Sequence, residues 1–269
     1  MTDPLLRIVD LKTHFQTKGA GLFGEKKVIM AVDGVSFDIA RGEVLSLVGE
    51  SGCGKSTVGR TLTHLEKATS GQAFFEGQDF LSMTPRKFRP LRREIQMIFQ
   101  DPFASLNPRL KIEQTLGEPL FIHGLCKNWN EARTKIAATL ELVGMDPKVM
   151  SRHPHEFSGG QRQRIGIARV MILKPKLVIA DEAVSALDVS IQAQVLNLIK
   201  KLQRDSGASM LFISHDLGVV RHISDRVAVM LAGKIVEIGD KNQIFEAPQH
   251  EYTRKLLDSI PRITIGKEV

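Results

Sequence analysis

The chain has 269 residues, of which 42% are hydrophobic and 25% charged, and its 37 basic and 30 acidic residues give a formal net charge of +7. This composition is typical of an ordinary globular protein with one large domain. No run approaches the roughly 18–20 apolar residues of a membrane-spanning helix, and the opening residues lack the pattern of a secretory signal. We therefore expect a cytosolic protein.

The basic surplus does not by itself identify a partner. It is compatible with nucleic acid, with anionic lipid headgroups or with a solvated surface. The basic residues form no long block, and a single Trp and a single Tyr provide no aromatic pattern on which bases would stack. We expect no nucleic-acid partner. The two cysteines, Cys53 and Cys126, predict neither a disulfide framework nor a CxxC metal site.

Strand and helix patterns alternate along most of the chain. Strands are predicted at residues 5–15, 35–39, 44–48, 73–75, 95–99, 177–180, 210–213, 227–231 and 234–238, with a loop at 17–27 and a tight hairpin at Ala232-Gly233. Helices are predicted at 57–66, 131–143, 161–173 and 189–204. Because residues 102–157 contain no convincing strand, they predict a helical lobe that interrupts a strand-bearing core.

The segment GESGCGKS at residues 49–56 fits the phosphate-loop pattern GxxxxGK[ST] and lies between a buried strand and a helix. Its glycines allow backbone N–H groups to point inward at phosphate oxygens. Lys55 supplies positive charge to the β- and γ-phosphates, and the Ser56 hydroxyl is a ligand type for Mg²⁺. The positive end of the following helix adds to the same site. The segment therefore predicts a nucleotide phosphate site.

A second apolar strand pattern ends in two carboxylates, Asp181 and Glu182. Asp181 stands where a carboxylate holds Mg²⁺ through water, and Glu182 where one orients or deprotonates the water that attacks the γ-phosphate. His215 and Gln100 also follow predicted strands, at the edge where ligands gather in open α/β sheets. The Gln100 amide is a candidate contact to Mg²⁺ or the attacking water, although the residue pattern alone does not single it out.

The segment Ser158-Gly159-Gly160-Gln161 precedes a predicted helix. A capping serine followed by two glycines exposes several N–H donors at a positive helix end, which predicts a second phosphate-binding surface. An ordinary glycine-containing helix start is the alternative. One phosphate loop binds one nucleotide, so two such surfaces indicate a head-to-tail dimer in which each ATP lies between the loop of one subunit and the SGGQ of the other.

Together these motifs resemble those of the ATP-binding cassette (ABC) ATPase family over nearly the whole chain. GESGCGKST matches its Walker A motif, and the resemblance assigns ATP contacts to Gly49, Glu50, Ser51, Gly52, Cys53, Gly54, Lys55, Ser56 and Thr57. Gln100 matches the Q-loop, FSGGQRQR the signature, VIADE the Walker B motif, SALD with Asp188 the D-loop, and His215 the switch histidine. The resemblance implies ATP hydrolysis with the cofactors ATP and Mg²⁺.

The resemblance also assigns roles to individual residues. It implies catalytic roles for Glu182, His215 and Gln100, and a Mg²⁺ site of Ser56, Gln100 and Asp181. It places Ser158, Gly159, Gly160 and Gln161 against the ATP bound by a partner subunit. Phe15 fits the spacing of the aromatic that stacks on adenine, and Phe23 is the alternative.

The expected fold is α/β, with a RecA-like P-loop NTPase core, an antiparallel β portion and an inserted α-helical subdomain. Residues 1–269 then form a single nucleotide-binding domain, divided into a core at 1–100 and 165–245, a helical subdomain at 101–164 and a C-terminal helical tail at 246–269. Two departures from the family pattern are Ala183, where most relatives have proline, and Phe157 in place of leucine. We expect activity to survive the first, since proline there would stiffen the turn but carries no chemistry, and the second is a conservative apolar change.

The segments MIFQDPFASLNPR around Gln100 and HEYTRKLLDSIPR near the end are similar to the oligopeptide, dipeptide and nickel importer branch, and GESGCGKST and DGVSF are most similar to its dipeptide F-type subunits. This implies a peripheral ATPase at the cytoplasmic face of the inner membrane that powers peptide uptake. The implied partners are a second ATPase subunit, identical or different, two transmembrane permease subunits and an extracytoplasmic substrate-binding protein. Because residues after Pro261 include no cysteine, we expect no iron–sulfur cluster.

The permease contact is expected near Gln100–Pro108, where Phe103, Leu106 and Pro108 are candidates to receive a permease helix. Nickel, glutathione or antimicrobial-peptide uptake are alternative cargoes that no residue here decides. A soluble ABC ATPase acting on DNA or ribosomes is a remote alternative. Such proteins tend to carry two cassettes, a coiled coil or zinc-binding cysteines, and this sequence shows none of these features. A module that holds ATP without cleaving it is a further alternative, and Glu182 and His215 argue against it.

Overall fold

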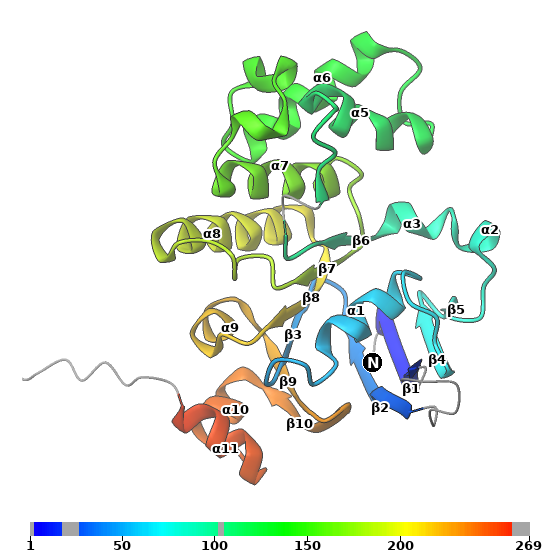
Figure 1. Ribbon diagram of the computed structural model, residues 1–269, viewed down its shortest axis with the longest axis vertical. Coiled ribbons are helices and arrows are strands. Elements are labelled where there is room, and N and C mark those ends of the chain that lie inside the picture. Colours follow the sequence, from blue (N-terminus) through cyan, green and yellow to red (C-terminus); the bar gives the residue numbers. More distant parts are fainter. Residues whose placement is uncertain (1–2, 18–26, 102–104, 260–269) are drawn as a thin grey trace, which may run out of the picture.

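A computed structural model describes residues 3–17, 27–101 and 105–259 of the chain. Within these residues the strands form two sheets, and most of the helices lie above or beside the larger one (Figure 1). None of the helices in these ranges is long and apolar enough to cross a membrane. Phe23 and Phe103 lie outside the described residues.

The smaller sheet is antiparallel. Its strands are β1 (Leu6–Thr17), β2 (Lys27–Ile39), β4 (Ser70–Phe75) and β5 (Gln78–Asp79), in the order β2-β1-β4-β5. The predicted strands at 5–15, 35–39 and 73–75 all belong to it. β2 begins eight residues earlier than predicted, because it continues to pair with β1 as far as Lys27. Val28, Ile29 and Met30 lack the alternation of a half-buried strand, and each exposes more than half of its surface.

The larger sheet is mostly parallel. Its strands are β3 (Val44–Val48), β6 (Ile95–Ile98), β7 (Leu177–Asp181), β8 (Ser209–Ser214), β9 (Arg226–Leu231) and β10 (Lys234–Asp240), in the order β10-β9-β3-β8-β7-β6. Every residue of β3, β7 and β8 is buried, as their near-continuous apolar runs predict for strands covered on both faces. Only β10 is antiparallel to its neighbour. Ala232 and Gly233 have left-handed backbone angles, which confirms the predicted tight hairpin.

Helices occupy the chain between β6 and β7. They are α5 (Ile112–Ile122), α6 (Trp129–Leu142), the 3₁₀ turns η1 (Pro147–Ser151) and η2 (Pro154–Glu156), and α7 (Gly159–Met171). No strand occurs among the described residues of this stretch, as predicted. α5 and α6 lie at one end of the molecule, and α7 connects them to the larger sheet (Figure 1).

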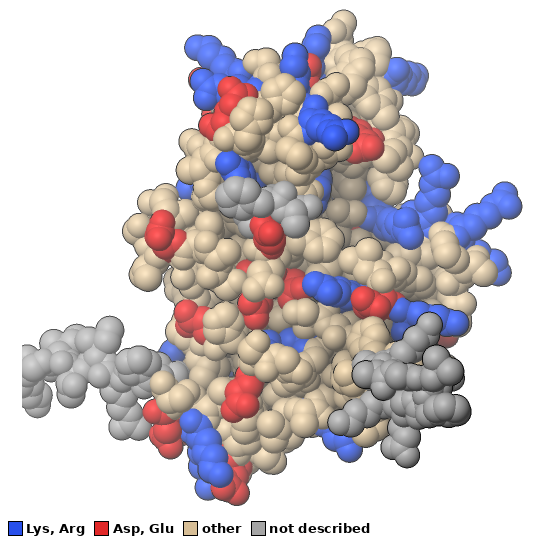
Figure 2. Space-filling view, in the orientation of Figure 1, with Lys and Arg blue, Asp and Glu red and all other residues tan. Residues whose placement is uncertain are grey.

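The remaining helices pack around the two sheets. They are α1 (Lys55–Leu62), α2 (Pro85–Phe88), α3 (Leu91–Glu94), α8 (Val189–Ser206), α9 (Leu217–Ile223), α10 (Lys241–Glu246) and α11 (Glu251–Asp258). α1 ends four residues before its predicted end, and the backbone N–H groups of Leu65 and Glu66 both donate to the carbonyl oxygen of Arg60. Lys and Arg side chains project where α2 and α3 lie, while basic and acidic groups are interspersed elsewhere on this face (Figure 2).

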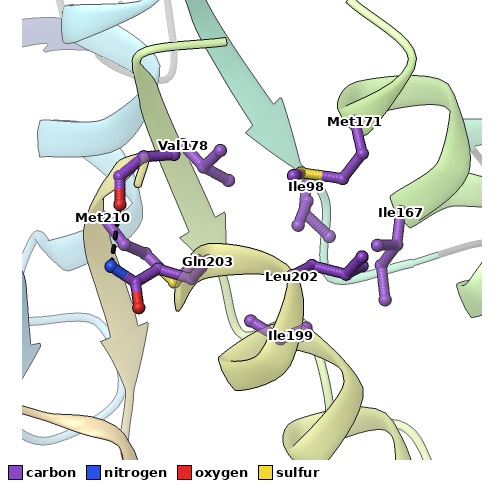
Figure 3. Close-up of a pocket in the computed structure, with 9 residues that line it drawn as sticks. Ile98, Ile167, Met171, Val178, Ile199, Leu202, Gln203 and Met210 are labelled. Atoms are coloured by element: carbon purple, nitrogen blue, oxygen red, sulfur yellow. Dashed lines mark hydrogen bonds between the residues drawn. The ribbon is translucent and has the colours of Figure 1, made fainter. Parts of the chain in front are cut away.

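The layer between α7, α8 and the sheet is tightly packed. Ile98 of β6, Ile167 of α7 and Ile199 of α8 line a cavity of only about 10 Å³ (Figure 3). At its edge the Gln203 side-chain amide donates a hydrogen bond of 2.8 Å to the carbonyl oxygen of Ala208. The apolar core is therefore continuous from the sheet into the helical region.

A buried leucine of α6 has an exposed counterpart two residues away. Leu140 is 0% exposed and Leu142 is 58% exposed. Leu140→Ala is expected to lower the free energy of unfolding by about 2–5 kcal/mol through lost apolar burial and a residual cavity. Leu142→Ala should change it by less than about 0.5 kcal/mol. Urea denaturation of both variants measures the difference, and equal effects would contradict the placement of this helix face.

Candidate functional site

Four neighbouring parallel strands end at one edge of the larger sheet. β3 leads into the phosphate loop, β8 into His215, β7 into Glu182 and β6 toward Gln100. The register places Val48 beside Ser214, Asp181 beside Ile213 and Ile98 beside Ala180. Motifs that are far apart in the sequence therefore meet at the carboxyl edge, where ligands bind in open α/β sheets.

The phosphate loop closes against two other segments of backbone. A Cβ atom at Gly49 would lie 2.2 Å from the Met230 carbonyl oxygen, and one at Gly54 would lie 1.9 Å from the Ala31 carbonyl oxygen. Both glycines also have positive φ angles, 153° and 108°. Only glycine fits these two positions, so the loop pattern in the sequence is dictated by close approach of the backbone as well as by its turn.

Lys55 begins α1 and is 4% exposed. Its Nζ donates hydrogen bonds of 2.8 Å to the carbonyl oxygens of both Gly49 and Glu50. Beside the loop lies a pocket of about 220 Å³, lined by Ala31, Ser51, Gly52, Gly54, Lys55, Ser56, Thr57, Gln100 and Glu182. The structure thus brings most of the predicted phosphate loop together with Gln100 and Glu182.

The Glu182 carboxylate is held from two sides. Its Oε2 accepts a hydrogen bond of 2.8 Å from Gln100 Nε2, and its Oε1 lies 3.2 Å from His215 Nδ1. The residue itself has a left-handed φ of 46°, and its N–H donates to the Ile213 carbonyl oxygen. A non-glycine residue in this region is strained, and such strain is concentrated at functional sites.

Asp181 is the last residue of β7 and is 2% exposed. Its Oδ1 accepts a hydrogen bond of 2.7 Å from the Ser56 hydroxyl. Burial raises the pKa of Asp181, and the Ser56 hydrogen bond and the charge of Arg60 only partly oppose this. A buried carboxylate beside a hydroxyl is a pair of hard oxygen ligands at the inner end of the phosphate loop.

The SGGQ segment forms the start of α7 and does not line the phosphate pocket. The Ser158 hydroxyl accepts from the Gln161 N–H, and the Gln161 side chain accepts from the Ser158 N–H, a reciprocal helix cap. Cβ atoms at Gly159 and Gly160 would lie 3.7 Å from Leu187 and 2.5 Å from Ile191. The segment therefore packs on the residues around Asp188, which precedes α8.

The structure corrects one expectation and leaves another without support. Leu106 is 2% exposed and belongs to the apolar core, so it does not present a surface to a permease helix; Pro108 is exposed. The aliphatic pattern around Leu106 did not distinguish burial from a docking surface. Phe15 lies on β1 opposite Ile29 and is not among the residues that line the phosphate pocket.

Ala31 and Tyr252 make contacts at the phosphate loop that were not predicted from the sequence. Ala31 of β2 lines the pocket, and the Tyr252 hydroxyl of α11 accepts a hydrogen bond of 3.2 Å from the Glu50 N–H. Ala31 meets the loop through its backbone carbonyl, and the residue type does not reveal a backbone contact. Tyr252 stands in the HEYT segment, which is recognisable as a motif but says nothing of which loop it meets.

Comparison with known proteins places this site in a family. A profile described as "ABC transporter" matches residues 32–185, and one described as "Oligopeptide/dipeptide transporter, C-terminal region" matches residues 236–269. The chain belongs to the ABC transporter family. It has the P-loop ABC ATPase fold, since it superposes on the dimeric, ADP- and Pi-bound ATP-binding cassette MJ0796 with a TM-score of 0.78 at 25% identity, covering 88% of this chain and 98% of that one.

Curated relatives of this ABC protein are more similar in sequence. It is 52% identical to the oligopeptide transport ATP-binding protein AppF of Bacillus subtilis over 96% of its own length and 79% of AppF. It is also 52% identical to the glutathione import ATP-binding protein GsiA of Pectobacterium atrosepticum, again over 96% of its own length. The chain spans only 41% of that GsiA sequence.

Asp181→Asn is expected to raise the free energy of unfolding of the protein at pH 7 in the absence of nucleotide and metal. Burial raises the pKa of Asp181 above its ordinary 3.8, so the unfolded chain releases this proton at a lower pH than the folded protein does. Stability is therefore lost as the pH rises from the unfolded pKa through the folded one, and Asn removes that loss.

Urea titrations in EDTA measure this effect. The advantage of Asp181→Asn should be present at pH 7 and shrink as the pH falls toward 3.8. Ser56→Ala serves as the matched control, because it removes the hydrogen bond to Asp181 but leaves the carboxylate buried. An Asp181→Asn variant that is less stable at pH 7 would show that the ionised carboxylate does not destabilise this site.

Proposed function

We propose that this chain is the ATP-binding and ATP-hydrolysing subunit of an importer that takes up peptides. The observation that carries the proposal is the Glu182 carboxylate, held between Gln100 and His215 at the mouth of the phosphate pocket. A phosphate loop alone binds nucleotide, whereas a positioned carboxylate beside it provides for hydrolysis. A module that only holds ATP would not need this arrangement.

The phosphate loop binds the β- and γ-phosphates through its inward N–H groups and the N-terminus of α1. Lys55 donates to two loop carbonyls within the same pocket, and the positive charge of its ammonium attracts the phosphates when ATP enters. Thr57 follows in the first turn of α1 and also lines the pocket. An aromatic residue that stacks on adenine completes the site, and Phe15 is the described candidate.

Ser56 and Asp181 fit a Mg²⁺ site, because a hydroxyl and a buried carboxylate 2.7 Å apart are hard oxygen donors beside the phosphate loop. Gln100, which lines the same pocket, contributes its amide oxygen. Bound Mg²⁺ neutralises charge on the phosphate oxygens. Burial keeps Asp181 away from competing water, while the loop and Lys55 fix where the phosphates lie.

Glu182 acts as the general base. Its carboxylate orients and deprotonates the attacking water, and Gln100 and His215 hold the two carboxylate oxygens in place. His215 Nδ1 faces Glu182, so the other ring nitrogen is directed away from that carboxylate. The ring is half exposed and is placed to sense the γ-phosphate of bound ATP.

A head-to-tail dimer completes each ATP site. The N–H donors at the start of α7 and the Ser158 hydroxyl contact the γ-phosphate of ATP held by the other subunit, with Asp188 beside them. The absence of the SGGQ segment from the pocket lining within one subunit supports this assignment. The post-hydrolysis MJ0796 cassette, to which the fold is similar, is described as dimeric.

The subunit works with two transmembrane permeases and an extracytoplasmic binding protein, as a peripheral protein at the cytoplasmic face of the membrane. Peptide cargo is supported by the oligopeptide relative and by the matched oligopeptide/dipeptide C-terminal region. Glutathione, itself a small peptide, is the second candidate, supported by the GsiA relative. Uptake of labelled dipeptide and of labelled glutathione, measured in a strain that lacks this gene, distinguishes the two cargoes.

Glu182→Gln is expected to lower kcat for ATP hydrolysis by on the order of 10²–10³-fold while ATP binding persists, because the amide cannot accept the proton of the attacking water. The matched control is Glu141→Gln on the exposed face of α6, which should hydrolyse ATP normally. Phosphate release and nucleotide affinity are measured in both. Turnover at the wild-type rate in Glu182→Gln would refute the role given to this residue.

The shared ATP sites are tested by mixing two disabled variants. Ser158→Arg removes the signature contact and Lys55→Ala removes the phosphate loop, so each dimer of one variant should be inactive. A mixed dimer contains one site with an intact loop and an intact signature. Random pairing makes about half of the dimers mixed, so about a quarter of the wild-type rate is restored. If mixing restores nothing while wild-type protein is active, the two motifs serve ATP within one subunit.

A further inference from the structure

The C-terminal helices pack against the strand that leads into the phosphate loop. Tyr252 and Leu256 of α11 and Phe245 of α10 contact a small apolar cluster that contains Val48, the last residue of β3. α10 contacts β9 and β10, and α11 lies next to α10 at the same end of the molecule (Figure 1). The residue after Val48 is Gly49, so this packing reaches the first position of the loop.

The start of α11 is fixed by one buried carboxylate. Glu237 of β10 accepts hydrogen bonds from the N–H groups of Gln249 and His250, at 2.8 and 3.0 Å. The His250 ring in turn accepts from the Tyr252 N–H and caps the helix. Burial raises the pKa of Glu237, but hydrogen bonding, from the Gln249 N–H first and then from Thr253 and His250, outweighs it and the net pKa lies below its ordinary value. The carboxylate is therefore ionised at neutral pH and holds α11 in register.

Tyr252 delivers its hydroxyl to the loop backbone. The hydroxyl oxygen accepts a hydrogen bond of 3.2 Å from the Glu50 N–H. Burial raises the pKa of Tyr252, and the hydrogen bond from the Glu50 N–H only partly opposes this, so Tyr252 stays a neutral hydroxyl. From the other side, the Glu50 carbonyl oxygen accepts from Lys55 Nζ at 2.8 Å and from the Cys53 N–H at 3.3 Å.

We propose that Tyr252 is a positioning residue that holds the phosphate loop in its nucleotide-binding shape through the Glu50 backbone. The inference rests on the proposed ATP-binding function and assigns a task to the C-terminal segment. It does not give Tyr252 any contact with the nucleotide.

The reason lies in the demand that ATP places on Lys55. Its ammonium donates to the Gly49 and Glu50 carbonyls, and bound phosphates compete with these carbonyls for its N–H donors. The Tyr252 hydroxyl does not line the phosphate pocket, so it continues to fix the Glu50 N–H under that competition. Without the hydroxyl, the loop is less ordered before nucleotide binds. Nucleotide binding must then order the loop, and this cost in free energy weakens the affinity. The carboxylate that performs the chemistry is not altered.

Tyr252→Phe tests the proposal, since it removes the hydroxyl and keeps the ring that packs on Val48. The dissociation constant for ADP, measured by calorimetry on the full chain, and KM for ATP should both rise about three- to tenfold, the value of one hydrogen bond. kcat should stay within about twofold. Hydrogen–deuterium exchange of the peptide that covers residues 49–55 should accelerate.

Leu257→Ala is the matched control on the same helix, because it removes apolar packing and keeps the hydroxyl. It should lower the melting temperature more than Tyr252→Phe does and leave ADP affinity within about twofold of wild type. An unchanged ADP affinity in Tyr252→Phe overturns the proposal, and so does an equal loss of affinity in Leu257→Ala. If wild-type protein binds ADP but fails to hydrolyse ATP, the proposed function fails while the ADP comparison still tests Tyr252.

Discussion

Everything at the site depends on the parallel pairing of β3, β8, β7 and β6. Parallel neighbours present their carboxyl ends at the same edge, so four loops from distant parts of the chain begin side by side. Gln100 and Glu182, 82 positions apart in the sequence, and Glu182 and His215, 33 positions apart, thereby come within hydrogen-bond distance. A shift of one residue in any of these ladders would carry one group out of reach and reverse the faces of a buried strand.

The sequence predicted the parts whose physics is local. Strands that are buried on both faces must be apolar throughout, which made β3, β7 and β8 recognisable. The phosphate loop was recognisable because Gly49 and Gly54 tolerate no side chain. The catalytic roles proposed for Glu182, His215 and Gln100 rested on the family resemblance, since a position after a strand does not by itself single out Gln100.

Properties set by tertiary neighbours were missed. β2 extends to Lys27 because β1 pairs with it there, a fact that neither strand's own pattern contains. Leu106 was expected at a surface and lies in the core, since an apolar residue beside proline fits either place. The hydroxyl of Tyr252 meets Glu50 across 202 residues of chain, and no local pattern predicts such a contact.

The site also has features that oppose folding. Asp181 is buried as a carboxylate, and Glu182 adopts a backbone conformation that costs roughly 1–3 kcal/mol. These costs are offset by the apolar side chains of the surrounding strands and helices that are buried in the core. The apolar sheet thus maintains an edge that would not form by itself, and substitutions that relieve the strain exchange function for stability.

The close packing of the SGGQ segment on α8 has a mechanical consequence. A Cβ atom at Gly160 would come within 2.5 Å of the Ile191 side chain, and one at Gly159 within 3.7 Å of Leu187. Gly160 therefore lies directly against Ile191, whereas a Cβ at Gly159 would meet Leu187 at an ordinary contact distance. Because Ile191 belongs to the first turn of α8, a displacement of that turn presses on the start of α7 and couples the motions of the two segments.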